Sequence, residues 1–213
     1  MIRVLVVDDH QLVRGGLCSV LGHAEGIEVV GEADSGEEAI QQVAAVKPDV
    51  VLMDINMAGI GGIEATRAIR RRFRRIQVVA VTALSEDPFS DKAQEAGALG
   101  FISKGCPAEE LTDAVRAAAR GTPFVSNDVA QRLAVARFKS RDEDPPLERL
   151  SSRELQVMLL ITNGVNNQAI SEKLFLSPKT VSTYRHRLYD KLGVSNDVEL
   201  THFALRYGLV ELR

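Results

Sequence analysis

The sequence predicts a doubly wound α/β domain with a parallel sheet, followed by a small all-α domain. Residues 2–120 alternate five apolar, β-branched segments with amphipathic segments, which is typical of a parallel sheet with right-handed crossovers. Residues 139–149 carry almost no apolar side chain and include Pro145 and Pro146, so they predict a linker. After residue 149 the strand pattern disappears and only helical periodicity remains.

The predicted strands are short and apolar, and several end at polar side chains. They comprise residues 2–9, 27–33, 49–55, 77–83 and 100–104. The third is continuous in its apolar character, which favours burial on both faces, as in a parallel sheet. A helical segment follows each strand, and a five-stranded sheet of order 2-1-3-4-5 is therefore expected.

The second half of the chain predicts helices with clear start signals. A linker helix is expected over residues 125–138, and the final domain has four helices. These four comprise residues 151–164, 166–175, 177–193 and 196–208. Ser151 or Ser152 is the predicted N-cap of the first, and Ser177 caps the third, with Pro178 at its first helical position.

Composition and cysteine usage favour a cytoplasmic protein without a membrane partner. The 213 residues are 45% hydrophobic, but no apolar run approaches the roughly 20 residues that a membrane span requires. The N-terminal apolar stretch is too short for a signal peptide. Cys18 and Cys106 stand alone, without zinc-ligand spacing, which fits a reducing compartment.

Charge is distributed unevenly between the two parts. Residues 1–138 contain 15 Lys and Arg against 19 Asp and Glu, whereas residues 147–213 contain 9 against 7. The segment "RAIRRRFRR" (67–75) is the exception in the acidic part. Basic residues complement the dipole at a helix C-terminus, so this run indicates a solvated helix end or, alternatively, a contact to DNA or to an acidic partner.

Polar side chains gather where four of the predicted strands end. Asp8 and Asp9 follow the first strand, Asp54 the third, Thr82 ends the fourth and Lys104 the fifth. In a doubly wound sheet these ends share one edge, so the three carboxylates are expected to converge. Repulsion between them predicts a bound cation, and Mg²⁺ suits carboxylate and phosphate oxygens.

Such a site suits phosphoryl transfer. Asp54 could attack a phosphoryl donor and carry an acyl phosphate while Mg²⁺ and Lys104 neutralise charge and Thr82 hydrogen-bonds the new oxygens. Each residue alone has an ordinary explanation, because a strand-end Asp is more often a helix N-cap. The coincidence of all five on successive strand ends favours the functional interpretation.

The motifs "VDD", "LMDINM", "VTA" and "ISK" occur in order, and residues 1–125 resemble the receiver domain of a two-component response regulator. The resemblance implies a flavodoxin-like fold in which Asp54 is the phosphoacceptor. It implies that Asp9 and Asp54 bind Mg²⁺ with the backbone carbonyl of Asn56, and that Asp8 supports the metal shell. It also implies Thr82 and Phe101 as a conformational switch pair.

Two positions depart from the usual receiver pattern. Ala58 stands where the family usually has proline, four residues after the phosphoacceptor, and Gly105 follows Lys104 where many receivers have proline. We therefore expect a more mobile loop after Asp54, which affects the lifetime of the phosphoryl group rather than the chemistry.

The turn "FLSPKT" between two short helices is typical of a helix-turn-helix. In the helix that follows, Val181, Leu188 and Leu192 share one face, and short polar side chains with basic flanks lie opposite. This pattern suits insertion into a DNA major groove. An amphipathic surface helix fits it equally well.

Residues 150–194 resemble a LuxR-type DNA-binding domain, which implies that residues 178–191 form the recognition helix. The side chains expected nearest the bases are Ser182, Thr183 and His186. The phosphate candidates are Lys179, Thr180, Tyr184, Arg185, Arg187 and Lys191. The last helix would form the dimer contact, through Val198, Thr201, His202 and Leu205.

The combination resembles NarL/FixJ-type response regulators and leans to the GacA/UvrY branch. It implies a receiver domain (1–125), a linker (126–146) and a DNA-binding domain (147–213). A sensor histidine kinase would phosphorylate Asp54, and the phosphorylated homodimer would bind an inverted repeat in double-stranded DNA and regulate transcription, without acting as an enzyme.

Two alternatives remain open on the sequence. A hydrolase with an aspartyl-phosphate intermediate usually needs a general-acid Asp two residues after the nucleophile, where this chain has Asn56. The other is a DNA-binding protein that works without phosphorylation and uses the receiver only to dimerise.

Overall fold

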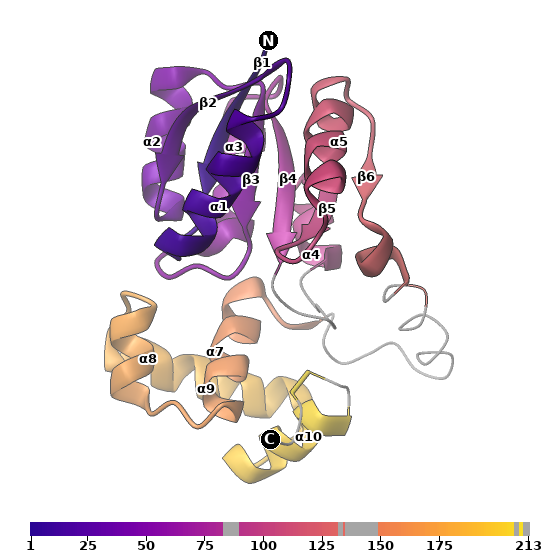
Figure 1. Cartoon of the computed structure of the whole chain (residues 1–213). Helices are drawn as coiled ribbons and strands as arrows, with labels where there is room; N and C mark the ends of the chain where they lie inside the picture. The colour runs from indigo at the N-terminus through magenta and orange to yellow at the C-terminus, as the bar shows by residue number, and fades with distance from the viewer. Residues whose placement is uncertain (83–89, 132–133, 135–148, 207–208, 211–213) are drawn as a thin grey trace. The chain divides into compact units, whose positions relative to one another are not determined.

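The structure is a computed structural model that describes residues 1–82, 90–131, 134, 149–206 and 209–210. The described residues fall into two compact units, one built around a sheet and one from four helices. Figure 1 shows the first in indigo through magenta to rose and the second in orange to yellow.

The first unit is a parallel sheet of six strands in the order β2-β1-β3-β4-β5-β6. The strands are β1 (Ile2–Val7), β2 (Ile27–Ala33), β3 (Val50–Asp54), β4 (Gln77–Thr82), β5 (Gly100–Ser103) and β6 (Phe124–Val125). The predicted order 2-1-3-4-5 is confirmed, and all five residues of β3 are buried, as its continuous apolar character predicted.

Helices cover both faces of this sheet (Figure 1). They are α1 (Gln11–Gly22), α2 (Gly36–Val46), α3 (Gly61–Arg72), α4 (Ser90–Glu95) and α5 (Ala108–Ala119). α1 and α5 pack with Leu21 and Val115 on one face, and α2 and α3 pack with Val43 and Ile69 on the other. Because side chains alternate along each strand, β1, β3 and β4 each contribute to both cores.

The sixth strand was not predicted, because the sequence was interpreted as helical from residue 125. Instead, Phe124 and Val125 pair with Gly100 and Phe101 at the edge of the sheet. Aromatic and β-branched side chains suit a half-buried strand, and the N–H of Ser126 continues the pairing by donating to the Phe101 carbonyl at 2.9 Å. The helix begins after this pairing, and residues 127–131 are helical.

The second unit contains α7 (Ser152–Thr162), α8 (Asn167–Lys173), α9 (Pro178–Leu192) and α10 (Asp197–Arg206). Its start signals are those that the sequence predicted. Ser151 caps α7 and forms a capping box with Glu154, and Ser177 caps α9, with Pro178 at the first helical position. Val181 and Leu188 are fully buried on one side of α9.

Some predicted features lie outside the described residues. They are the start of the helix expected before Ser90, most of the linker at 126–146 and the last two residues of the final helix. Among the residues that the structure describes, no helix combines the length and the apolar character needed to cross a lipid bilayer.

Candidate functional site

The carboxyl ends of β1, β3, β4 and β5 bring the predicted site residues to one edge of the sheet. Asp8 follows β1, Asp54 is the last residue of β3, Thr82 ends β4 and Lys104 follows β5. Neighbouring strands are in register there, since Asp54 aligns with Val81. The backbone N–H of Lys104 also donates to the Thr82 carbonyl at 2.7 Å. Asp8, Asp9 and Asp54 each present an oxygen within 4.8 Å of the others, so the expected convergence of the three carboxylates is observed.

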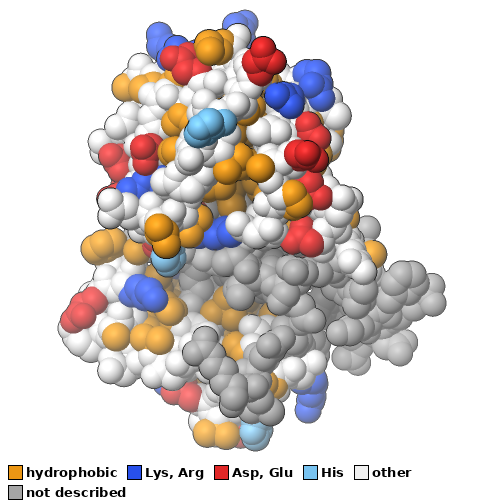
Figure 2. Space-filling view, viewed as in Figure 1, with side chains coloured by type: hydrophobic (Ala, Val, Ile, Leu, Met, Phe, Trp, Pro, Cys, Tyr) orange, Lys and Arg blue, Asp and Glu red, His pale blue; other side chains and the backbone are white. Residues whose placement is uncertain are grey.

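Lys104 joins the two buried carboxylates of this edge. Its Nζ lies 2.8 Å from Asp54 Oδ2 and 2.8 Å from Asp8 Oδ2. Asp8 and Asp54 both have 0% exposed surface. Two carboxylates removed from water need compensation, and one ammonium placed between them supplies only part of it. Figure 2 shows acidic and basic side chains interspersed over the visible surface, whereas this cluster is buried.

The electrostatics of Asp54 reflect this partial compensation. Burial raises the pKa of Asp54 to about 6, although the charge and hydrogen bond of Lys104 act in the opposite direction. Asp8 raises it further by repulsion, and the N–H of Asn56, which donates to Asp54 Oδ1 at 3.0 Å, lowers it. The pKa of Lys104 is itself raised, because its two carboxylate partners outweigh the effect of its own burial.

The same edge has the ligand atoms that a hard cation needs. Asp8, Asp9, His10 and Asp54 each present an atom within 4.8 Å of the others. Asp8 Oδ2 is buried, and the contact that compensates its charge is the ion pair with Lys104 Nζ at 2.8 Å. A buried carboxylate oxygen among further carboxylates is a suitable ligand for Mg²⁺. The residues present therefore fit this ion.

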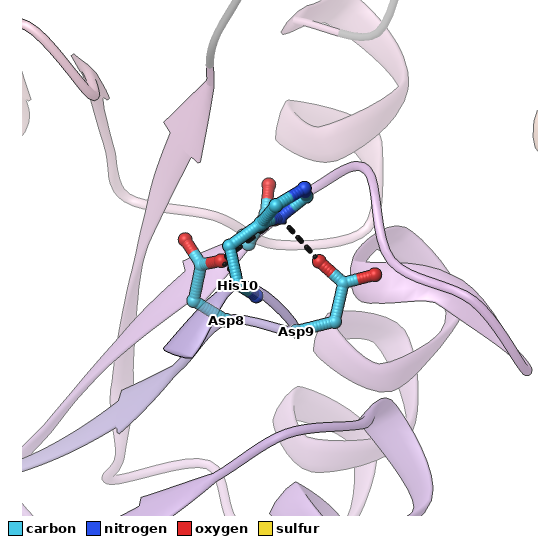
Figure 3. A group of neighbouring side chains, drawn as sticks. Asp8, Asp9 and His10 are labelled. Carbon is cyan, nitrogen blue, oxygen red and sulfur yellow. Dashed lines mark hydrogen bonds and ion pairs between the residues drawn. The ribbon is translucent and has the colours of Figure 1, made fainter. Parts of the chain in front are cut away.

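His10 is a member of this group that the sequence analysis missed. Figure 3 shows its ring between the carboxylates of Asp8 and Asp9. Its Nδ1 lies 2.7 Å from Asp9 Oδ1 and 3.4 Å from Asp8 Oδ1, and its backbone N–H donates to Asp8 Oδ1 at 2.8 Å. Its position directly after the two acids in "VDDH" was the signal that could have revealed it.

The remaining residues predicted for this unit lie near the site or behind it. Thr82 is 2% exposed at the end of β4, and Phe101 is 8% exposed in β5 and aligned with Ala80. Asn56 is the second residue of the loop after β3, and the N–H of Ala58 in that loop donates to Asp9 Oδ2 at 3.4 Å. A proline at position 58 could not make this bond.

In the second unit, α9 exposes a polar face opposite its buried side. Lys179, Thr183, His186 and Arg187 are exposed on that face. Ser182 is half-buried, and its hydroxyl donates to the Pro178 carbonyl at 3.1 Å. Among the described residues, Lys179 and Arg187 form no ion pair, so their charges are available to a partner.

Other predicted DNA contacts are engaged within the unit. Lys191 Nζ lies 2.7 Å from Glu154 and donates to the Arg149 carbonyl at 3.1 Å. Arg185 pairs with Asp197 and also donates to Asn167 Oδ1 at 2.6 Å. Thr180 is bonded to the Ser177 cap, and Tyr184 is half-buried. These bonds join α9 to α7, α8 and α10. Because the partners lie on other helices, the pattern within α9 did not reveal that these side chains also stabilise the unit.

The residues predicted for dimer contacts share one face of α10. Val198 is 65% exposed and His202 is exposed, whereas Thr201 and Leu205 are half-buried. Leu200 and Ala204 face the core of the unit and are fully buried. The exposed Val198 gives this face an apolar position that the unit itself does not cover.

Known families match both units. Residues 4–116 match the response regulator receiver domain, and residues 148–204 match the bacterial regulatory proteins of the luxR family. The chain belongs to the two-component response regulators. It combines a receiver with a LuxR-type DNA-binding domain, the arrangement of NarL/FixJ-type regulators, for which phosphorylation and dimerisation are typical.

This response regulator resembles its relatives over almost its whole length. It is 48% identical to the response regulator GacA of Pseudomonas aeruginosa over 211 residues, which is 99% of each chain. It is 46% identical to the response regulator UvrY of Escherichia coli K12 over 209 residues, 98% of this chain and 96% of that one. The predicted resemblance to the GacA/UvrY branch is thereby confirmed.

Solved structures of response regulators share the architecture. The response regulator ChrA of a heme-sensing two-component system covers 98% of both chains at 34% identity, with a TM-score of 0.56. The response regulator RcsB, solved as a complex with DNA, covers 96% of this chain and 98% of its own at 26% identity, with a TM-score of 0.60.

Proposed function

We propose that this response regulator is phosphorylated on Asp54 by a sensor histidine kinase and then regulates transcription as a DNA-bound homodimer. The observation that carries the proposal is the position of Lys104, within 2.8 Å of two fully buried carboxylates at the carboxyl edge of the sheet. Nothing in the packing of the core requires these charges, and burying them costs free energy. A functional role explains why they are there.

In the proposed reaction, an Asp54 carboxylate oxygen forms a bond to phosphorus as the phosphorus–nitrogen bond of a phosphohistidine breaks and the imidazole leaves. Asp8, Asp9, Asp54 and the carbonyl of Asn56 would hold Mg²⁺, which when bound supplies positive charge to the phosphoryl oxygens. Lys104 stabilises the same oxygens from the β5 side, and its ammonium is already in place.

The signal would leave the site through β4 and β5. Thr82 ends the strand beside Asp54, and in the proposed switch its hydroxyl would hydrogen-bond the phosphoryl oxygens. Phe101 lies in the next strand, aligned with Ala80, and forms the second half of the proposed switch. Their combined movement would alter the surface of the receiver that faces its partners.

The output would be made by α9 and α10. The exposed face of α9 would enter the major groove, with Thr183 and His186 near the bases and Lys179 and Arg187 on phosphates. α10 would pair with its copy through Val198 and the neighbouring positions 201, 202 and 205. A symmetric dimer of this kind reads an inverted repeat.

The test of the phosphoacceptor compares two strand-end aspartates. With acetyl phosphate and MgCl₂, Asp54→Asn is expected to lose all acid-labile phosphate, because its amide cannot form the acyl phosphate. Asp34→Asn is the matched control, since Asp34 follows β2 and is exposed. It should incorporate phosphate like the wild type. Equal incorporation in Asp54→Asn would refute the assignment.

The test of the output uses sites selected from random DNA at one fixed salt concentration. Binding with and without a beryllofluoride mimic of the phosphoryl group should differ, because dimerisation adds a second half-site contact through a high effective concentration. Equal affinity in the two states would favour the alternative in which the receiver only dimerises and phosphorylation is dispensable.

A further inference from the structure

The loop between β3 and α3, residues 55–60, carries one proposed metal ligand and adjoins another. At its ends the N–H of Ile55 donates to the Val81 carbonyl at 3.1 Å, and the N–H of Gly62 donates to the Ile55 carbonyl at 3.2 Å. Within it, the Asn56 N–H donates to Asp54 at 3.0 Å and the Ala58 N–H to Asp9 at 3.4 Å. The second half of the loop therefore needs support from elsewhere.

That support comes from the first turn of α2. Glu37 Oε1 accepts a hydrogen bond from the backbone N–H of Ile60 at 3.0 Å. A charged acceptor makes this bond stronger than a bond between neutral groups. Among the described hydrogen bonds, this one alone ties the loop to a helix other than α3.

Two glycines let the loop and the helix approach this closely. An ideal Cβ at Gly59 would lie 2.6 and 2.7 Å from the two carboxylate oxygens of Glu37, and Gly59 has a φ of +69°. An ideal Cβ at Gly36 would lie 2.8 Å from a side-chain carbon of Ile60. A side chain at Gly36 would press against Ile60 and Ala65, and a side chain at Gly59 would displace the Glu37 carboxylate, so the contact depends on glycine at both positions.

We propose that Glu37 is a positioning residue for the phosphorylation site. Its carboxylate holds Ile60 and thereby fixes the loop that presents the Asn56 carbonyl and the Ala58 N–H to the acidic edge. This inference rests on the proposed function. A fixed loop loses less conformational entropy when a cation binds, so the contact raises the affinity of the site for Mg²⁺ without touching the ion.

The experiment measures Mg²⁺ binding to the full chain by titration with MgCl₂. Calorimetry and backbone amide chemical shifts are the two readouts. Glu37→Ala should weaken binding about five- to tenfold, since the loop must then be ordered on binding. The Ile60 amide should also exchange with solvent faster. Glu37→Gln keeps an acceptor oxygen and should stay within about twofold of the wild type.

Glu38→Ala is the matched control. It removes the same charge from the same helical turn, but the Glu38 carboxylate accepts from the Asp34 N–H at 2.9 Å rather than from the loop. It should bind Mg²⁺ within about twofold of the wild type. Glu38→Ala or Glu37→Gln could also weaken Mg²⁺ binding as much as Glu37→Ala does. The loss of a negative charge from the first turn of α2 would then explain the weaker binding, and the proposal would be overturned.

Two further outcomes separate this inference from the proposed function. Unchanged Mg²⁺ affinity and unchanged Ile60 exchange in Glu37→Ala would overturn the positioning role while leaving Asp54 as phosphoacceptor. A wild-type chain that binds no Mg²⁺ would instead overturn the proposed metal site. In that case faster Ile60 exchange in Glu37→Ala would still support the contact, and unchanged exchange would refute it.

Discussion

Gly62, in the first turn of α3, packs directly on the backbone of the residue that carries the proposed phosphoryl group. An ideal Cβ at this position would lie 2.8 Å from the Asp54 carbonyl carbon and 2.9 Å from Ile55 Cα, and it would overlap the Asp54 carbonyl oxygen. All three neighbours are backbone atoms of β3 or its end, so none can move aside by a change of rotamer. We predict that Gly62→Ala destabilises the receiver unit.

The magnitude follows from two opposing effects. Alanine in place of glycine inside a helix normally stabilises by about 1 kcal/mol. Ordinary contacts begin near 3.4 Å, so α3 must retreat from β3 by more than half an ångström at the carbonyl carbon alone. Overpacking of this kind costs about 3 kcal/mol when the neighbours are rigid. The net destabilisation is about 2 kcal/mol, or a Tm lower by about 5–10 °C.

Calorimetry of the full chain checks this, with Gly16→Ala as the control. Gly16 lies in the middle of α1 and is exposed, and an added Cβ would meet nothing within 4 Å. That substitution should raise the stability of the same unit by about 0.5–1 kcal/mol. The same glycine-to-alanine change is thus expected to lower the stability of the unit at position 62 and to raise it at position 16. A Gly62→Ala chain as stable as the wild type would refute the packing argument.

Two further predictions concern the DNA-binding unit. Phe175 is 77% exposed and has a φ of +50°. Because asparagine tolerates a left-handed backbone better than phenylalanine does, Phe175→Asn should stabilise this unit by about 1 kcal/mol. Urea denaturation measures this, and a loss of stability would contradict it. Lys191→Met leaves the buried Glu154 without its ammonium and should cost about 1–2 kcal/mol at pH 7, a value reduced because Lys191 is partly exposed. Burial raises the pKa of Glu154, but the bonds from Lys191 and Ser151 outweigh it and leave the pKa below 4.5. The stability gained is therefore present at neutral pH and lost as the pH falls below 4.5, and denaturation at pH 7 and pH 3 should show a smaller pH effect in the variant.

The strand ends and helix starts could be predicted because each depends on residues close together in the sequence. Asp54 stands at the end of a continuous apolar run, and the topology of a parallel sheet then places it beside Asp8 and Lys104. Ser151 and Ser177 precede apolar periodic segments and cap α7 and α9. These features are local, and one rule of topology suffices to assemble them.

The features that escaped prediction depend on contacts between side chains of separate elements. The LuxR resemblance implied Arg185 and Lys191 as phosphate contacts, and the sequence did not indicate that Arg185 also pairs with Asp197 and Lys191 with Glu154. Periodicity places a residue on a face of its helix, but it does not show which neighbouring helix packs there. The bond from Ile60 to Glu37 has the same character, since it joins a loop to a preceding helix.

The charges at this edge of the sheet bear on two proposed properties, the binding of a divalent cation and the response to phosphorylation. Asp8, Asp9 and Asp54 are opposed by the single ammonium of Lys104, so two negative charges remain uncompensated when all three are ionised. A divalent cation matches that deficit. The proposed phosphorylation of Asp54 would replace one negative charge with about two, next to Thr82. Because Asp54 is fully buried, the added charge would be a large perturbation, and we expect the strand end beside it to respond.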